Sequence, residues 1–466
     1  MSSVHRQEVI GYDDWAILTL PSSATKIIQM RRGGTISLGK FGVFKVDNIV
    51  GYAYGQSFEV LEDKEVQPMK SISYGMEDNS ESREATPGLD FQSSEDNRDL
   101  LDRGSENQKI TAEEIEKMKK EGSGNEVANK IIEKIIQGHG SFDKKTIYSQ
   151  EKYLTRKQKK FTRRFTVNSL TTSNLLNHIR KDRDPERILG LSEETLGLIM
   201  SHANVMPGGN YLVMDETGGL IVYSMLERMQ GNGSITLLHE NDQPKLALFR
   251  HTNYTEEELS EMVKPISLLE FIDPKGSRSS FVPLPEEVVD GMSEMRKTRY
   301  LRRVKRVRQV NATLDMVEGN SFDGLVYVST INPVTFVPDI IDRLKGSRSF
   351  SIYSQYKEVL LGLNHILLRD KRVLLPNIYE SRVRKFQTIP GKVHPLMTSI
   401  GGGGYVMSGI KVFPKEGAVA SGRRSKKRRA EEAEAAVKLQ KVEGEEDGDE
   451  NAKPQGEVEE DYTTSD

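Results

Sequence analysis

Short apolar runs alternate with glycine, proline and polar residues between Trp15 and Leu61. Runs of this length at this spacing predict the strands of a small antiparallel barrel or sandwich. We therefore assign residues 1–74 to an N-terminal β-barrel. From residue 75 to residue 106 the pattern changes, because apolar side chains become rare and acidic and small polar residues dominate.

Helical periodicity follows in residues 107–184, which we assign to a helical connector. Thr111 and Glu114 have the spacing of a capping box, which predicts the start of a short helix. Val127 and Ile131 then recur at helical spacing on one face of a second helix. That apolar face must pack on another element, and we expect it to pack on the barrel.

The end of the connector is strongly basic. Seven of the thirteen residues from Lys152 to Arg164 are Lys or Arg, and Tyr153 and Phe161 lie among them. One interpretation is a solvated charged linker. The other is a connector that follows a phosphate backbone and offers an aromatic ring for base stacking. The second interpretation makes six residues RNA-binding candidates: Arg156, Lys157, Lys159, Lys160, Arg163 and Arg164.

Beyond Pro185, short apolar runs alternate with helical stretches. The runs at residues 211–214 and 234–238 are typical of buried strands, and the alternation predicts a doubly wound sheet. The glycines at 401–404 stand directly before apolar residues, which indicates a strand with a close backbone approach. We assign residues 185–415 to a Rossmann-like, methyltransferase-type domain, so the chain combines α+β and α/β parts.

The turn after the 211–214 strand lies where a Rossmann-like methyltransferase binds S-adenosylmethionine. Such a site needs glycines so that the backbone can approach the cofactor. Here Asp215 and Thr217 take two of the three glycine places, and Gly219 takes the third. The side chains of Asp215 and Thr217 obstruct the approach. The two carboxylates of the turn, on Asp215 and Glu216, would also face the cofactor's own carboxylate. The sequence therefore predicts a degenerate turn, with no cofactor bound by this chain.

Charge is divided unevenly along the chain. The formal net charge is -3, but residues 75–106 carry -7 and residues 430–466 carry -11, which leaves +15 on the remainder. Both acidic stretches are poor in apolar residues and are predicted to be disordered. A body with that positive excess is expected to bind a polyanion, most commonly nucleic acid.

The composition excludes several classes of protein. There is no cysteine, so disulfides, zinc ribbons and thiol nucleophiles are impossible. No metal-ligand spacing and no apolar run long enough to cross a membrane are found, and a soluble intracellular protein is expected.

Two further basic clusters stand out. Eight of the thirteen residues at 296–308 are Lys or Arg, on a predicted helix with Tyr300 and Val304 on its apolar face. A merely solvated helix is usually mixed in sign, so nucleic-acid contact is favoured, with three candidate residues: Arg302, Arg303 and Arg306. The second cluster lies in the predicted disordered tail, residues 416–466, ahead of its acidic run. It indicates nuclear import and a nuclear protein, or else another RNA-contacting patch, and consists of Arg423, Arg424, Lys426, Lys427, Arg428 and Arg429.

Three segments, in order along the chain, resemble one family. They are residues 32–42, the series 142–153, 184–191 and 215–219, and the stretch Arg384-Lys-Phe-Gln-Thr-Ile-Pro-Gly-Lys-Val-His-Pro395 that continues into 401–405. Through them the chain resembles the non-catalytic subunit of the eukaryotic tRNA (adenine-58-N1)-methyltransferase. The resemblance spans about residues 10–415, without the acidic insert.

The resemblance implies a homologous catalytic subunit that carries S-adenosylmethionine, and a heterotetramer of two plus two subunits on tRNA. It also places Ser329 opposite the aspartate with which the catalytic relative contacts the target adenine. A serine hydroxyl cannot replace that carboxylate. We therefore expect a subunit that performs no chemistry and binds tRNA, with Arg382, Arg384 and Lys385 among its RNA contacts. Two alternatives stay open: an active methyltransferase with an atypical cofactor site, and a general RNA-binding or translation-associated scaffold.

Overall fold

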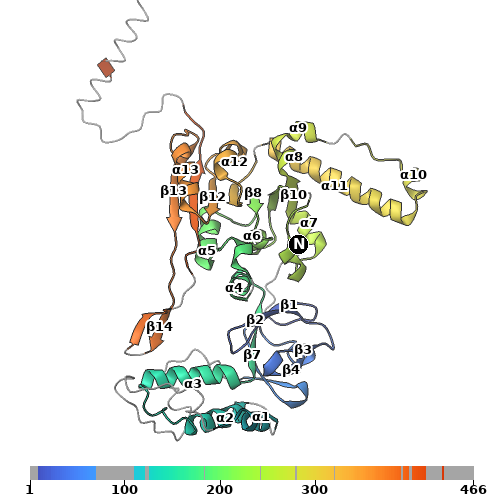
Figure 1. Cartoon of the computed structure of the whole chain (residues 1–466). Helices are drawn as coiled ribbons and strands as arrows, with labels where there is room; N and C mark the ends of the chain where they lie inside the picture. The colour runs from blue at the N-terminus through green and yellow to red at the C-terminus, as the bar shows by residue number, and fades with distance from the viewer. Residues whose placement is uncertain are drawn as a thin grey trace, which may run out of the picture. The chain divides into compact units, whose positions relative to one another are not determined.

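The computed structural model (Figure 1) describes residues 9–69, 110–120, 125–182, 184–241, 243–278, 281–319, 321–389, 392–397, 401–415 and 433–434. The chain divides into a compact unit that ends at Phe413 and a second unit that begins at Pro414. Nearly all described residues belong to the first unit. The acidic insert at 75–106 and the basic cluster from Arg423 to Arg429 lie outside the described residues.

The N-terminal strands are antiparallel, as the sequence predicts. They are β1 (Trp15–Thr19), β2 (Thr25–Gln29), β3 (Thr35–Ser37), β4 (Val43–Lys45), β5 (Ser57–Val60), β6 (Val66–Pro68) and β7 (Arg164–Ser169). Three short 3-10 helices interrupt them: η1 (Gly39–Phe41), η2 (Val46–Asn48) and η3 (Glu62–Lys64). Five strands form a sheet in the order β2-β1-β7-β5-β6, while β3 and β4 pair with each other. Among the described strands β2 and β6 are therefore open edges, and the hydrogen bonds do not close into a ring.

The middle strand of this sheet comes from the segment that the sequence assigns to the connector. β7 pairs with β1 on one side and with β5 on the other. The ring of Phe165 on β7 lies 4.4 Å from that of Phe44 and 5.6 Å from that of Phe58, measured between centroids. All three rings are buried. The N-terminal core therefore needs residues from beyond the acidic insert.

The helices α1 (Ala112–Lys120), α2 (Asn125–Gln137) and α3 (Ile147–Phe161) share a small hydrophobic core of their own. The expected capping box is present, because Thr111 N–H donates to Glu114 Oε2 at 3.1 Å and Glu114 N–H to Thr111 Oγ1 at 3.3 Å. The buried isoleucines of α2 pack with Phe142 and Phe161, not with the β-strands. The expected packing of α2 on the barrel is thus wrong, since the apolar face of α3 supplies its partner.

The second half of the chain builds a mixed seven-stranded sheet. Its strands are β8 (Asn210–Asp215), β9 (Ser234–His239), β10 (Val263–Ser267), β11 (Gly324–Val328), β12 (Ser349–Ser354), β13 (Val373–Glu380) and β16 (Tyr405–Lys411). They lie in the order β10-β9-β8-β11-β12-β16-β13, parallel except for β16. The winding direction reverses between β8 and β11, as in a doubly wound Rossmann-like sheet, so that prediction is confirmed.

Helices cover both faces of this sheet (Figure 1). They are α4 (Thr172–Asp182), α5 (Glu193–His202), α6 (Leu220–Met229), α7 (Glu256–Met262), α8 (Leu268–Ile272), α9 (Pro274–Ser277), α10 (Glu286–Asp290), α11 (Glu294–Glu318), α12 (Pro333–Ile340) and α13 (Lys357–Leu367), with η5 (Pro185–Ile188), η6 (Ala247–His251) and η7 (Ile341–Arg343). Alternate residues of β8 enter different cores, Val213 on one face and Leu212 and Met214 on the other. The sheet is therefore buried on both sides, which explains the continuous apolar runs of its strands.

Two features connect β13 to β16. The first is the hairpin of β14 (Phe386–Ile389) and β15 (Lys392–Pro395). The second is the glycine run, in which Gly404 has φ +83 and a Cβ on Gly403 would collide with the side chain of Ser192. The predicted close backbone approach at these glycines is confirmed.

Candidate nucleic-acid interface and cofactor turn

The turn after β8 uses its own side chains to satisfy the start of α6. Asp215 Oδ1 accepts hydrogen bonds from the N–H and the hydroxyl of Thr217 at 2.7 and 2.5 Å, and Oδ2 accepts from Val222 N–H at 3.1 Å. Thr217 Oγ1 in turn accepts from Ile221 N–H at 3.3 Å. Free N–H groups at a helix start are what an anionic ligand would bind, and here those of Ile221 and Val222 are already occupied. Burial raises the pKa of Asp215, and the hydrogen bonds from Thr217 and Val222 oppose that shift.

Gly219, the last glycine of the turn, is also covered. Gly219 has φ +102, and a Cβ built there would lie 3.1 Å from Phe249 on η6. The N–H of Leu248 donates to the carbonyl of Gly218 at 3.1 Å, so η6 is bonded across the turn. The ring of Phe249 is 8% exposed and packs against Tyr223 of α6, with centroids 5.9 Å apart. Side chains thus cover the backbone at Gly219, where a cofactor would approach it.

The end of β11 is pinned to the same turn. Ser329 Oγ accepts from the N–H of Ile331 at 3.0 Å, and its residue is 8% exposed. Glu216 Oε2 accepts from both the N–H and the hydroxyl of Thr330 at 2.7 Å. These polar groups therefore hold two loops together. Together with Asp215 and Phe249, the side chains of Glu216 and Ser329 form a site that does not fit S-adenosylmethionine.

The predicted basic connector is a helix whose aromatic residues are in use. Arg156, Lys159 and Lys160 of α3 are exposed, whereas Lys157, Arg163 and Arg164 are half-buried. The ring of Tyr153 lies between Lys145 and Lys157, whose Nζ atoms are 4.7 and 4.9 Å from its centroid. Burial lowers the pKa of Lys157, and the charges of Lys160 and Lys145 lower it further.

Tyr153 and Phe161, the two aromatic residues among the basic residues of α3, both pack inside the protein. His139 packs edge-on against Tyr153, with centroids 5.1 Å apart, and Phe142 lies on the same ring. Phe161 is 8% exposed, in the core of the helical unit. Phe161 therefore cannot supply the ring for base stacking, because this small core needs it, whereas Tyr153 is half-buried against His139 and Phe142.

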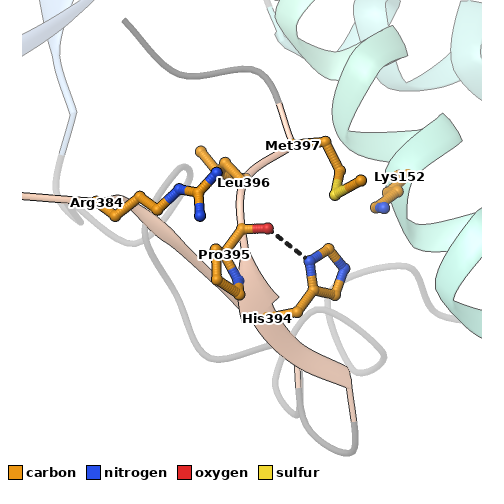
Figure 2. Close-up of a pocket in the computed structure, with 6 residues that line it drawn as sticks. All are labelled: Lys152, Arg384, His394, Pro395, Leu396 and Met397. Carbon is orange, nitrogen blue, oxygen red and sulfur yellow. Dashed lines mark hydrogen bonds between the residues drawn. The ribbon is translucent and has the colours of Figure 1, made fainter. Parts of the chain in front are cut away.

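Residues of α3 and of the β14–β15 hairpin segment together line an open hollow of about 690 Å³. Arg384 and Lys152 contribute cations to it, and the remaining lining comes from His394, Pro395, Leu396 and Met397 (Figure 2). The tertiary structure therefore brings together two of the predicted RNA-binding segments. Sequence reasoning missed His394, Leu396 and Met397, although they stand within or beside the motif that carries the family resemblance.

The neighbours of Arg384 differ from it in their contacts. Arg382 Nε donates to Glu380 Oε1 at 2.6 Å, so its charge is already paired. Lys385 is exposed, and its carbonyl accepts from the N–H of Leu396 at 2.8 Å, which fixes the base of the hairpin. Arg384 makes no ion pair with any residue that the structure describes.

The third predicted segment, on α11, forms a separate basic surface. Its apolar face is covered as expected, with Val304 buried and the Tyr300 hydroxyl accepting from Leu284 N–H at 2.6 Å. Arg302, Arg303 and Arg306 are all exposed, and Arg303 lies 5.1 Å from the ring centroid of Phe281. α11 packs on β10, α8 and α9, and contributes no residue to the hollow beside α3.

The described residues lack two kinds of feature. No group of three or more histidine or acidic side chains is placed to hold a metal ion in that part of the chain. None of the helices described there has the length and apolar character that crossing a bilayer requires.

Comparison with known proteins identifies relatives across most of the chain. A model of the Gcd10p family matches residues 9–294. The tRNA (adenine(58)-N(1))-methyltransferase non-catalytic subunit TRM6 of Debaryomyces hansenii is 45% identical over 443 residues, covering 93% of each chain. Its namesake in Kluyveromyces lactis is 39% identical over 422 residues, covering 87% of each. A solved tRNA (m1A58) methyltransferase of Aquifex aeolicus aligns at 10% identity with a TM-score of 0.42, over 87% of this chain and 99% of that one.

Proposed function

The chain belongs to the Gcd10p family, and on that premise we propose that it is the non-catalytic, tRNA-binding subunit of a tRNA (adenine-58-N1)-methyltransferase complex. Its partner is a catalytic methyltransferase subunit that carries S-adenosylmethionine, and the two assemble as a heterotetramer of two plus two subunits. The complex methylates N1 of the T-loop adenosine in tRNA.

The closed turn after β8 supports this division of labour. Asp215 and Phe249 fill the space that a cofactor needs. The hydroxyl oxygen of Ser329 accepts a hydrogen bond from the backbone N–H of Ile331. A chain with this turn has neither a place for the methyl donor nor a carboxylate at the position opposite the target base. Both must come from the partner.

The basic surfaces support the RNA-binding role. Adenine N1 lies on the Watson–Crick edge, so the base must leave the folded tRNA elbow before a methyl group can reach it. Holding a structured RNA open requires backbone contacts on more than one side of the target. The exposed cations of α3, of the β14–β15 hairpin and of α11 provide such contacts on a subunit that performs no reaction itself.

The hollow between α3 and the hairpin is the observation that carries the RNA-binding role. It places Arg384 and Lys152, from segments distant in the sequence, on one surface without a carboxylate partner among the described residues. Cations in that state can bind phosphate without first breaking a bond inside the protein.

The tail supports a nuclear location. Six basic residues occur among the seven from Arg423 to Arg429, which is the composition of an import signal. Removing that cluster from a fluorescently labelled chain should shift it from the nucleus to the cytoplasm. Retention in the nucleus without the cluster would reject this assignment.

Calorimetry separates this function from an active methyltransferase. The purified chain alone should show no S-adenosylmethionine binding, whereas the complex with its partner should bind the cofactor and methylate tRNA. Micromolar binding to the single chain would favour an atypical cofactor site. If the chain co-purifies with no methyltransferase-like subunit, a general RNA-binding scaffold becomes the better explanation.

A further inference from the structure

The hollow between α3 and the β14–β15 hairpin combines two kinds of surface. Arg384 and Lys152 lie on opposite sides of it in Figure 2, and Leu396 and Met397 lie between them. Met397 is 89% exposed and Leu396 is 37% exposed, so this apolar floor is open to solvent. Its volume of about 690 Å³ falls within the roughly 300–1,000 Å³ that is usual for ligand sites.

The apolar floor is not what a phosphate alone would need. A phosphate is held by N–H donors and cations. The apolar side chains of Pro395, Leu396 and Met397 add nothing to that interaction. A nucleotide that has left its stack offers both parts, a flat base for the apolar floor and phosphates on either side for the cations. Met is suited to such a floor because its thioether is polarizable and adapts to an aromatic face.

His394 adds a polar contact of defined character. Its Nδ1 lies 2.8 Å from the carbonyl oxygen of Pro395 (Figure 2), and a carbonyl can only accept, so Nδ1 carries the proton. In the neutral ring Nε2 then keeps its lone pair. That atom can accept a hydrogen bond from a ribose 2′-hydroxyl or from an amino group on a base.

We infer that this hollow binds a single unstacked RNA nucleotide, with the base on Leu396 and Met397 and its flanking phosphates on Arg384 and Lys152. The inference rests on the proposed tRNA-binding function and deepens it. The hollow on α11 is a poor second choice for the same ligand, because Glu294 lines it beside Arg299 and Arg302 and would repel the phosphates.

The test uses the full chain assembled with its catalytic partner and a series of tRNAs, each with one base removed and the backbone intact. For the wild-type complex, removal of the bound base should weaken binding about fivefold or more, since stacking of one base contributes roughly 1–3 kcal/mol. With Met397→Gln, intact tRNA should bind with a similar loss, and removing that same base should change little further. Affinities are measured by fluorescence anisotropy at one fixed salt concentration.

A matched control uses another exposed methionine. Met206, in the turn after α5, is 43% exposed, and Met206→Gln should keep the full penalty for the missing base. If the penalty is the same in Met397→Gln as in wild type, or if no single base matters to the wild-type complex, the inference is overturned. Failure of the proposed function looks different, because then the wild-type complex would not bind intact tRNA at all.

Discussion

The turn after β8 and the hollow beside α3 treat their polar groups in opposite ways. In the turn, Asp215 accepts three hydrogen bonds from its own loop and helix, and Phe249 covers Gly219. In the hollow, Arg384 and Lys152 face solvent with no ion pair to any described residue. In the first region the side chains of Asp215 and Thr217 are satisfied by the protein's own backbone and hydroxyl groups. In the second region the two cations have no such partner among the described residues.

This difference suggests how a methyltransferase-like fold can serve without catalysis. A few side chains close the cofactor turn and add to stability, because each buried donor finds an acceptor. The proposed RNA contacts lie elsewhere, on a hairpin and a helix that are not part of the seven-stranded sheet. Three measurements can break or sharpen this contrast.

The largest effect concerns salt. If the open basic surfaces neutralise six to ten phosphates, tRNA affinity should fall about a thousand-fold or more between roughly 50 and 200 mM monovalent salt. Fluorescence anisotropy with the assembled complex measures it. A flat salt dependence would contradict the electrostatic role of α3, α11 and the hairpin.

The closed turn should fail through stability instead. Asp215→Ala removes the acceptor of the Thr217 and Val222 N–H groups, and the free energy of unfolding should drop by about 3 kcal/mol. Urea denaturation measures the change, while the folded variant should bind tRNA as before. Glu240→Ala, at the exposed end of β9, is the control and should cost no more than about 0.5 kcal/mol. Equal stability of the two variants would mean that the turn is not held by Asp215.

The smallest effect compares two arginines of one loop. Arg384→Gln should weaken tRNA binding about tenfold and lower the salt slope by about one, because a direct phosphate contact is lost. Arg382→Gln should cost only about two- to threefold, since Glu380 already holds that guanidinium. Both variants should assemble with the partner as the wild type does, and size-exclusion chromatography measures this assembly. A loss of assembly in Arg384→Gln would place that residue at the subunit interface.

Much of the fold could be predicted because its signals are local. Each helix cap joins two residues that are three apart in the sequence. Thr195 N–H donates to Ser192 at the start of α5, and Glu114 N–H donates to Thr111 at the start of α1. The strands of the doubly wound sheet were visible as continuous apolar runs, since both of their faces are buried. The basic residues of α11 likewise could be placed on an exposed helix from their spacing alone.

Other features could not be predicted because they depend on distant partners. β7 directly follows the basic run of α3 in the sequence, and it was not recognised as a strand. Its place between β1 and β5 depends on which strands can bury Phe165. Tyr153 or Phe161 was expected to offer a ring for base stacking, but Phe161 is buried in the core of the α1–α3 helices and Tyr153 packs against His139. A periodic pattern shows that a face is apolar and says nothing of what will cover it.

By itself, the sequence determined what this chain lacks and how its charge is divided. Asp215 and Thr217 stand where a cofactor needs bare backbone, and any packing leaves their side chains there. Only the tertiary structure decided that Phe249 covers Gly219 in the turn and that Lys152 and Arg384 line the same hollow. Steric obstruction is local and travels with the residue, whereas a surface shared by two distant segments exists only after the chain has chosen which apolar faces to bury together.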